Sequence, residues 1–469
     1  ESKERIRSCF KNIGLDFPVK RVLVNLSPAD IKKKGSSFDL GIFLGILSNI
    51  GKIRNIENFK NYLILGEISL NGEVKSVKGA INATILAKEK GIRGVIIPYE
   101  NYDEACLISG VEIVPVSRIE EAVSFLNGKI NLDELHKSMK EKMNLKKNEK
   151  SKKNREEKNV VDFSDVKGQL LAKRAMEIAA AGGHNIFLMG DPGSGKSMLA
   201  KRFVTILPEM SEKEIIETTK IYSISGMLSP DKPVITERPF RAPHHSATQT
   251  ALVGGAIRAG EITLALNGVF FMDELGEFGT RTLETLRQPL EDENVTISRA
   301  NLIVNYPVNN IMIAASNPTP GGFFQDDPQC RDSLRDIKNY QKKFSGPLLD
   351  RIDLYVEMRR LKKEEIFSEI ESESSEIIRK RVIKAREIQR KRFNEDFLNG
   401  KMNRKQISEY CKIDEEAKKI LERAIDELKL SVRAYDKILK VSRTIADLEN
   451  SENIEVVHLL EALNYRKKY

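Results

Sequence analysis

Gly190-Asp191-Pro192-Gly193-Ser194-Gly195-Lys196-Ser197 is the stretch of this 469-residue chain that decides its fold. It matches the pattern GxxxxGK[ST], in which glycines allow successive backbone N–H groups to turn inward around phosphates. The apolar run His184 to Met189 precedes it, and a helical pattern begins near Met198. A strand, a glycine-rich loop and a helix in this order predict a phosphate-binding loop. Lys196 would bridge the β- and γ-phosphates and the Ser197 hydroxyl would contact Mg²⁺, so ATP and Mg²⁺ are the expected cofactors.

A second apolar run ends in two carboxylates. Val269 to Met272 leads directly into Asp273 and Glu274. In phosphoryl transfer, Asp273 would hold Mg²⁺ through its water shell and Glu274 would polarise the attacking water. A strand that ends in Asp-Glu is usually a solvated turn. Because this one follows a phosphate-binding loop, it predicts the hydrolytic centre of an ATPase.

Polar side chains at later turns could act on the γ-phosphate. Asn317 follows the predicted buried strand Asn310 to Ser316, where its amide could contact the γ-phosphate, although Asn-Pro alone is a common turn starter. Arg351 lies on a turn and could reach the nucleotide of the next subunit, where such arginines contribute about 10³ to 10⁵ in rate. The alternative for Arg351 is a salt bridge to Asp353. Arg433 begins a later helix, in the helical C-terminal region, and could sense the nucleotide from the side of that region.

The apolar pattern divides this α/β protein into four parts. Residues 1–128 alternate helices with short strands, such as Arg21 to Leu26, and form a compact domain. We expect this domain to be N-terminally incomplete, because the chain opens in a helix-like segment without an initiating Met. Residues 129–159 form a charged linker. Residues 160–360 form a core of parallel strands buried on both faces, and residues 361–469 form an all-helical lid.

Charge and cysteine content limit the functional classes. Lys137 to Lys158 contains ten basic and four acidic residues, a net +6 of the chain's +9. The simpler interpretation is a solvated, mobile linker, and the alternative is a tether that also contacts phosphates. The four cysteines form no CxxC pair, which gives no disulfide framework and favours a reducing cytoplasm. No run of about 18 apolar residues predicts a membrane span.

Taken in order, these motifs resemble the ComM/YifB family, in the magnesium-chelatase-like branch of AAA+ ATPases. The resemblance covers essentially the whole chain and implies a parallel-sheet core with a helical lid. Its most specific stretches are Pro239 to Ala247, Leu252 to Ala256 with Gly260 to Ile262, Phe271 to Leu275, Leu286 to Glu291, Ser345 to Leu354 and Ser442 to Leu448.

The same resemblance assigns a role to each candidate residue. It places Lys196 in Walker A and the Asp273-Glu274 pair in Walker B. It makes Asn317 sensor 1, Arg351 the arginine finger and Arg433 sensor 2. Family members are similar to hexameric motors that drive branch migration of DNA joints during transformation. The implied activity is therefore that of a DNA helicase or branch-migration translocase, acting as a homo-hexamer on branched or single-stranded DNA. The alternative is a chelatase-like ATPase that remodels a partner protein without DNA.

Segments inserted in the ATPase core offer candidate DNA contacts. Arg241, His244 and His245 lie in Pro239 to Gly255, and Arg299 lies at the tip of a predicted hairpin. In chelatase-like motors such insertions face the central channel. The competing interpretations are structural histidines and a solvated arginine. Contacts to phosphate would make DNA binding strongly salt-dependent.

The chain departs from the family after Asn317. The family usually has NPCPCG followed by a further pair of cysteines, whereas here Thr319 and Gly321 take the first two positions. Of the later pair only Cys330 remains, with Asp332 in place of the other. Structural zinc takes four ligands, so we predict no zinc site.

The N-terminal region resembles the peptidase domain of Lon proteases, which has a ribosomal-protein-like fold. Gly35 to Asp39 aligns with the loop that bears the nucleophilic serine of Lon and places Ser37 there. The activating lysine of Lon would fall near Ile81, and an isoleucine cannot accept the proton of a serine. We therefore expect Lys75 and Lys78 to be surface charges and the domain to lack protease activity.

Overall fold

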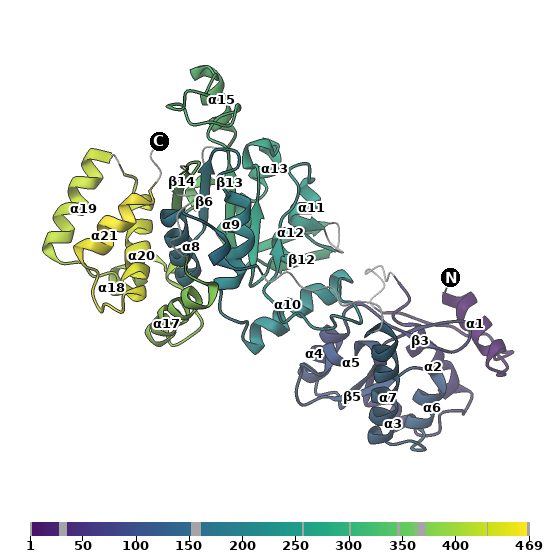
Figure 1. Ribbon diagram of the computed structural model, residues 1–469. Coiled ribbons are helices and arrows are strands. Elements are labelled where there is room, and N and C mark those ends of the chain that lie inside the picture. Colours follow the sequence, from purple (N-terminus) through teal and green to yellow (C-terminus); the bar gives the residue numbers. More distant parts are fainter. Residues whose placement is uncertain are drawn as a thin grey trace. The chain divides into compact units, whose positions relative to one another are not determined.

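The computed structural model describes residues 2–27, 35–151, 161–255, 258–299, 302–344, 348–361, 363, 372–428 and 430–466 (Figure 1). The chain forms two compact units, each discontinuous in sequence. Unit 1 comprises residues 1–158, 211–236 and 298–303, and unit 2 comprises residues 159–210, 237–297 and 304–469. No helix among the described residues combines the length and the apolar character needed to cross a bilayer.

Unit 2 is built on a five-stranded parallel sheet. Its strands, in spatial order, are β14 (Leu354–Met358), β6 (Ile186–Gly190), β13 (Ile311–Ser316), β10 (Val269–Met272) and β7 (Phe240–Arg241). All residues of β6, β10 and β13 are buried, as expected for strands covered on both faces. Because these strands are parallel neighbours, the residues that follow them meet at one edge of the sheet.

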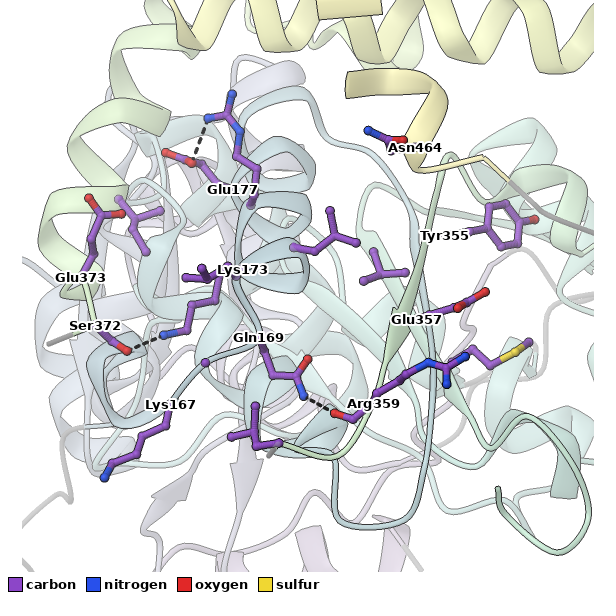
Figure 2. A pocket seen from close by; sticks show the side chains of 18 of the residues that line it. Lys167, Gln169, Lys173, Glu177, Tyr355, Glu357, Arg359, Ser372, Glu373 and Asn464 are labelled. Atoms are coloured by element: carbon purple, nitrogen blue, oxygen red, sulfur yellow. Dashed lines mark hydrogen bonds and ion pairs between the residues drawn. The ribbon is translucent and has the colours of Figure 1, made fainter. Parts of the chain in front are cut away.

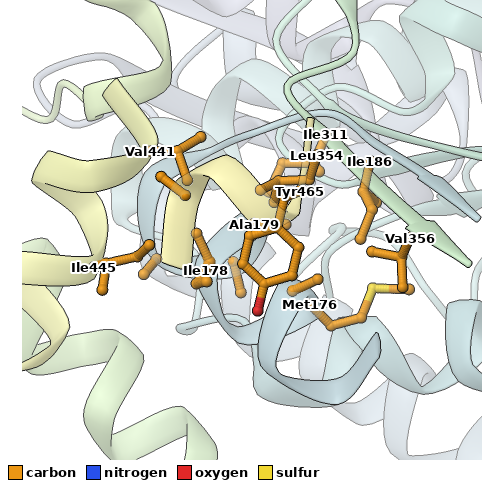
Figure 3. Packing of buried hydrophobic residues seen from close by; sticks show 14 of the residues in the cluster. Met176, Ile178, Ala179, Ile186, Ile311, Leu354, Val356, Val441, Ile445 and Tyr465 are labelled. Carbon is orange, nitrogen blue, oxygen red and sulfur yellow. The ribbon is translucent and has the colours of Figure 1, made fainter. Parts of the chain in front are cut away.

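Helices pack against this sheet and form the C-terminal part of unit 2. Figure 3 shows Met176 and Ile178 of α8 (Leu170–Gly182), Val441 and Ile445 of α20 (Val432–Leu448) and the fully buried Tyr465 around one apolar cluster. The apolar residues of α20 recur at helical spacing, which is why one face of this helix is buried. The other C-terminal helices are α17 (Ser375–Phe393), α18 (Arg404–Tyr410), α19 (Glu415–Leu428) and α21 (Val456–Asn464).

Short elements connect the strands of unit 2. They are η2 (Phe163–Asp165), α9 (Lys196–Arg202), η3 (Phe203–Ile206), α11 (Gln249–Val253), β8 (Gly254–Gly255), β9 (Arg258–Ala259), α12 (Glu261–Leu264), η4 (Leu275–Glu277), α13 (Thr280–Glu284), α14 (Arg287–Asp292), α15 (Leu334–Phe344), η5 (Leu349–Arg351) and η6 (Asn399–Lys401). The predicted hairpin before β13 is present as β11 (Asn294–Arg299) and β12 (Leu302–Pro307). The sheet and the helical C-terminal region confirm the predicted α/β fold.

Unit 1 contains a smaller parallel sheet in the order β1 (Tyr62–Ile64), β4 (Gly94–Pro98) and β5 (Glu112–Val116). A two-stranded antiparallel sheet of β2 (Glu67–Ile68) and β3 (Val74–Lys75) accompanies it. Its helices are α1 (Ser2–Asn12), α2 (Asp39–Asn49), α3 (Ile56–Lys60), α4 (Ala80–Glu89), η1 (Tyr99–Asn101), α5 (Tyr102–Ala105), α6 (Ile119–Leu126), α7 (Leu132–Ser151) and α10 (Glu212–Ser225).

Some segments of unit 1 differ from the sequence expectation. Arg21 to Leu26, expected as a strand, has no strand partner among the described residues, and Leu23 is 84% exposed. The charged run expected to be a linker begins in α7, because Leu135 and Met139, one helical turn apart, are buried. Lys142 of α7 donates a hydrogen bond to Glu121 at 2.7 Å. Apolar anchoring therefore makes the first part of this run structured.

Candidate nucleotide site

The phosphate-binding loop follows β6 and has the backbone that its glycines permit. Gly193 and Gly195 adopt φ angles of +80° and +93°, in the left-handed region that favours glycine. Gly190 lies so close to β14 that a Cβ atom there would be 2.2 Å from the carbonyl oxygen of Met358. Gly195 is the N-cap of α9, so the loop opens directly into that helix. The predicted order of strand, loop and helix is present.

Lys196 is a buried cation at the centre of this loop. Its Nζ donates hydrogen bonds to the carbonyls of Gly190 and Asp191 and, at 3.2 Å, to Oδ1 of Asn317. Burial lowers the pKa of Lys196, and the charges of Asp273 and other nearby carboxylates oppose that shift. Within the described chain, no carboxylate lies at ion-pair distance from Nζ. The ammonium is therefore placed to receive an anion.

The residues of the loop fit a nucleotide triphosphate. Among the described residues, the buried Ser194 hydroxyl of the loop has no hydrogen-bond partner, and Lys196 has no carboxylate at ion-pair distance. Ser197 Oγ donates to Oδ2 of Asp273 at 2.6 Å, which brings together the two predicted Mg²⁺ residues. A hydroxyl and a carboxylate are hard oxygen ligands of the kind that Mg²⁺ prefers. The loop thus offers cationic and N–H groups to phosphates and oxygen atoms to the metal.

Glu274 follows Asp273 in a left-handed backbone conformation, with φ at +51°. Its side chain is 60% exposed, and Oε2 contacts Nδ1 of His245 at 3.1 Å. The ring of His244 lies against that of His245, with centroids 4.0 Å apart. His245, predicted as a DNA contact, is thus placed beside the carboxylate predicted to act on the attacking water. Sequence spacing gave no signal of this contact.

The predicted finger and sensor 2 lie together at a second place in unit 2. Arg351 forms an ion pair with Glu291, and this hydrogen bond and charge hold the pKa of Glu291 below its usual range. Arg433 approaches Asp350 at 3.8 Å. The structure records no hydrogen bond or ion pair from either guanidinium to residues 190–197, all of which are described. The partner of Arg351 is Glu291, whereas the sequence-based alternative was Asp353.

The remaining DNA candidates are placed as follows. Arg241 ends β7 and makes a two-pronged ion pair with Glu261, with hydrogen bonds of 2.6 and 2.8 Å. Nδ1 of His244 lies 2.8 Å from the hydroxyl of Ser246. Arg299 is the last residue of β11, and its side chain lies outside the described part of the chain.

A cavity of about 960 Å³ in unit 2 was not anticipated from the sequence. Figure 2 shows that Lys167 and Gln169, which precede α8, and Tyr355 and Glu357 of β14 line it. Nε2 of Gln169 donates to the carbonyls of Ser194 and Arg359, at 3.2 and 2.7 Å. The cavity therefore borders the phosphate-binding loop. In the sequence, the only indication of this cavity was a polar residue, Gln169, directly before the helix α8.

The segment that departs from the family is closed by hydrogen bonds. The backbone N–H of Gly321 donates to Oδ2 of Asp332 at 2.8 Å, and the Thr319 hydroxyl donates to the carbonyl of Phe323 at 2.9 Å. In the described residues, no cluster of three or more His, Cys, Asp or Glu side chains is arranged to hold a metal ion. Asp332 thus joins two chain segments by this hydrogen bond.

In unit 1, the two positions aligned with the Lon dyad, Ser37 and Ile81, lie in different surroundings. Ser37 lies just before α2, and the neighbouring Ser36 donates its hydroxyl to Glu67. Ile81 of α4 is completely buried. Gly79 to Ile81 are held by other groups: the Gly79 N–H donates to Ser223 Oγ, and the Ile81 N–H donates to Glu104. The aliphatic side chain of Ile81 thus occupies the position that aligns with the activating lysine of Lon.

The parallel sheet, the loop after β6 and the carboxylates after β10 have the arrangement expected of a nucleotide-hydrolase site of the AAA+ class. Family models agree: residues 162–366 match magnesium chelatase subunit ChlI, residues 372–466 match its C-terminal region, and residues 1–101 match a further ChlI region. The chain is 42% identical to competence protein ComM of Haemophilus influenzae and 38% identical to the uncharacterised protein YifB of Escherichia coli. Each match covers 99% of this chain and 89% of the relative.

A third relative concerns a shorter part of the chain. Lon protease 2 of Bacillus subtilis is 36% identical over 124 residues, which cover 26% of this chain and 22% of that protein. This chain belongs to the magnesium-chelatase-like family of AAA+ ATPases that includes ComM and YifB. The family implies the use of ATP and Mg²⁺. The predicted family is thereby confirmed, including a partial likeness to Lon.

Proposed function

We propose that this protein is an ATP-hydrolysing ring motor that remodels DNA and drives branch migration when incoming DNA recombines. The observation that carries the hydrolase part is the buried Lys196, which lies beside Asn317 and, in the described part of the chain, forms no ion pair with a carboxylate. The pairing of Ser197 with Asp273 supports it. The DNA part is supported by 42% identity to a protein named for competence.

Each residue of the site has a distinct proposed role. Bound Mg²⁺ supplies charge neutralisation at the β- and γ-phosphates. Lys196 holds the phosphates, Ser197 and Asp273 hold the metal, and Glu274 orients and polarises the attacking water. Asn317 accepts a hydrogen bond from Lys196, and a γ-phosphate held by Lys196 would lie within reach of its amide, so Asn317 can report on the nucleotide. The cavity lined by Gln169 and Tyr355 receives the base and sugar.

The separation of binding from hydrolysis tests these roles. Glu274→Gln should retain ATP and lower the hydrolysis rate by about 10² to 10⁴, because it removes a positioned base but no phosphate contact. ATP affinity is measured by titration calorimetry and turnover by phosphate release. Asp273→Asn is the matched comparison, since it should weaken Mg²⁺-dependent binding as well. Equal loss of ATP binding in both variants would contradict the assignment.

Arg351 and Arg433 are proposed to act in the site of a neighbouring subunit. Their placement beside Asp350 and Glu291, without contacts to residues 190–197, supports this arrangement. Arg351→Ala should bind ATP normally and hydrolyse it poorly. Mixed with a Lys196→Ala chain in a hexamer, it should regain activity, because each inactive chain supplies what the other lacks. Mixed rings without recovered activity would exclude a role in trans.

DNA contact is proposed for Arg241, His244, His245 and Arg299. Arg241 is engaged by Glu261, so Arg299 gives the cleaner test. Four-way or forked DNA should stimulate hydrolysis, and Arg299→Ala should reduce that stimulation and flatten its salt dependence by about one unit of slope. The control is Arg390→Ala, which removes an exposed arginine of α17 that pairs with Asp396.

The result also decides between the DNA motor and its alternative. If no DNA structure changes the hydrolysis rate of the wild-type protein, the chelatase-like remodelling of a partner protein becomes the better proposal. That alternative needs the same loop, Lys196 and Glu274, so a lost response to DNA would leave the ATPase assignment intact.

A further inference from the structure

Hydrogen bonds to backbone carbonyls hold the turn that carries Arg351. Residues 349 to 352 form η5 and the step into β14, and three carbonyls of this turn accept side-chain hydrogen bonds. The Leu349 carbonyl accepts from the hydroxyl of Tyr355, and the Arg351 carbonyl accepts from Nδ2 of Asn185 at 3.1 Å. The Ile352 carbonyl accepts from Nζ of Lys437 at 2.6 Å. Side-chain donors from three separate segments of the chain therefore fix one short turn.

Asn185 connects this turn to the sheet that carries the nucleotide loop. It immediately precedes β6, and its Oδ1 accepts from the backbone N–H of Met312 in β13 at 2.8 Å. Its own carbonyl accepts from the N–H groups of Asp353 and Leu354, at 3.0 and 3.1 Å. The nitrogen and the oxygen of one side-chain amide thus join the turn of residues 349 to 352 to β13, the strand that directly precedes Asn317.

Lys437 connects the same turn to the helical C-terminal region. It lies on α20, one turn after Arg433 and seven residues before Thr444, so the three share a helix face. Thr444 Oγ1 lies 2.8 Å from Nε2 of the buried His184, whose Nδ1 contacts Asp353 at 3.2 Å. Arg433 approaches Asp350. This face of α20 follows the turn from Asp350 to Asp353.

The guanidinium itself has few restraints. Arg351 pairs with Glu291, and its Nε is buried without a hydrogen-bond partner. The position of the Arg351 guanidinium must therefore be set by the backbone of the turn. A misplacement of about 1 Å at a catalytic group can lower the reaction rate by a factor of about 10². A turn whose carbonyls are individually held is suited to present an arginine accurately to a separate molecule.

We propose that Asn185 and Lys437 are positioning residues that set the arginine finger, and that Lys437 makes finger position depend on the helical region of the same subunit. This inference rests on the proposed role of Arg351 in trans. Through Asn185 and Lys437, one turn is joined to the sheet behind its own nucleotide loop and to α20. A shift of α20 in one subunit is thereby passed to hydrolysis in the next.

The test uses Lys437→Met, which keeps the aliphatic stem and removes the donor to Ile352. Lys440→Met is the matched control: Lys440 lies on the same helix, is also partly buried, and donates to the carbonyl of Gly400 at 3.0 Å. Burial lowers the pKa of both lysines, so the two substitutions remove ammonium groups from similar surroundings. Lys437→Arg, which retains a donor, is the conservative variant.

Each chain is assayed alone and after co-purification with Lys196→Ala through two affinity tags, so that every sample contains both chains. We expect Lys437→Met to bind ATP as the wild type does, to hydrolyse it about tenfold more slowly, and to regain activity with Lys196→Ala. Lys437→Arg should recover most of the rate, and Lys440→Met should be unaffected. Asn185→Asp, which replaces the amide donor to the Arg351 carbonyl with a carboxylate oxygen and keeps an acceptor for the Met312 N–H, should repeat the pattern of Lys437→Met.

Other outcomes overturn the inference. If Arg351→Ala is inactive and both Lys437→Met and Asn185→Asp are fully active, the positioning role fails while the finger role stands. If Arg351→Ala is itself active, the finger role fails and the inference fails with it. A Lys437→Met defect that Lys196→Ala cannot complement would place the damage in the chain's own site. A Lys440→Met defect of equal size would show a general effect of α20.

Discussion

Lys196 in unit 2 and Glu104 in unit 1 are both buried charged groups, and their surroundings differ. Burial lowers the pKa of Lys196 and raises that of Glu104, so each environment disfavours the charged form. Glu104 accepts hydrogen bonds from Ser223, Asn101 and the Ile81 N–H, which satisfy it within its own unit. Within the described residues, Lys196 donates hydrogen bonds to neutral oxygens only, and the carboxylates around it, Asp273 among them, lie beyond ion-pair distance.

This difference teaches that burial of a charge does not by itself identify a functional site. A carboxylate surrounded by donors from its own unit is a structural link, and here it joins α5 to α10 through Ser223. A cation that meets only neutral acceptors retains most of its attraction for an anionic ligand. The comparison therefore distinguishes the candidate nucleotide site of unit 2 from a structural charge in unit 1 more clearly than residue type does.

The largest expected effect is at Lys196. Lys196→Met should weaken ATP binding by about 10² or more, because charge-assisted phosphate contacts contribute about 1.5–3 kcal/mol each. It should leave the nucleotide-free protein as stable as the wild type or more so, since it removes a desolvated charge. Calorimetric ATP titration and thermal unfolding check the two parts. A strongly lowered unfolding temperature without nucleotide would show that Lys196 is structural.

Glu104 should give the opposite result. Glu104→Leu leaves the donors of Ser223 and Asn101 without their acceptor, at a cost of about 1–3 kcal/mol in the stability of unit 1. ATP affinity should stay unchanged. Faster hydrogen exchange in α4, α5 and α10, with normal ATP binding, is the expected signature. Lost ATP binding would contradict the structural interpretation.

The pH dependence of unit 1 gives a smaller effect with a defined sign. A carboxyl group whose folded-state pKa is raised destabilises the fold once it ionises. The cost is absent well below the ordinary pKa of 4.5, develops as the pH rises from there to the raised pKa of Glu104, and is complete above it. Glu104→Gln should remove this dependence. Unfolding temperatures from pH 4 to 8 for both proteins measure it, and parallel curves would refute the assignment.

Ser37→Ala should have the smallest effect. The structure records no hydrogen bond from the hydroxyl of this described residue, and Ile81 stands where a lysine would be needed. Stability should change by no more than about 0.5 kcal/mol, and ATP hydrolysis should be unchanged. A serine-reactive fluorophosphonate should not label the protein. Labelling that disappears in Ser37→Ala would restore the protease interpretation.

Much of the arrangement of the candidate nucleotide site could be predicted, because its motifs are short continuous stretches of sequence. GxxxxGK[ST] after an apolar strand and Asp-Glu at the end of another each place polar groups at a strand terminus. Parallel pairing of β6, β13 and β10 then brings Lys196, Asn317 and Asp273 to one edge. The family assignment followed from the same local stretches.

Contacts between distant segments were not predictable in this way. Neither hydrophobic periodicity nor motif spacing indicates that Glu291 pairs with Arg351, that Glu261 pairs with Arg241, or that Glu274 meets His245. The position of α10 in unit 1 is a similar case, since its sequence lies between two segments of unit 2. Surface ion pairs and docked helices depend on which faces the completed fold brings together.

The sequence by itself determined the family, the α/β class, the order of strand, loop and helix around GxxxxGK[ST] and a partial likeness to Lon, because each depends on residues close together in the chain. Only the tertiary structure decided the surroundings of Arg351 and Arg433, the cavity beside Gln169 and the support given by Asn185 and Lys437. These features join residues far apart in sequence. Their energy comes from packing and hydrogen bonds that exist only once the chain has folded.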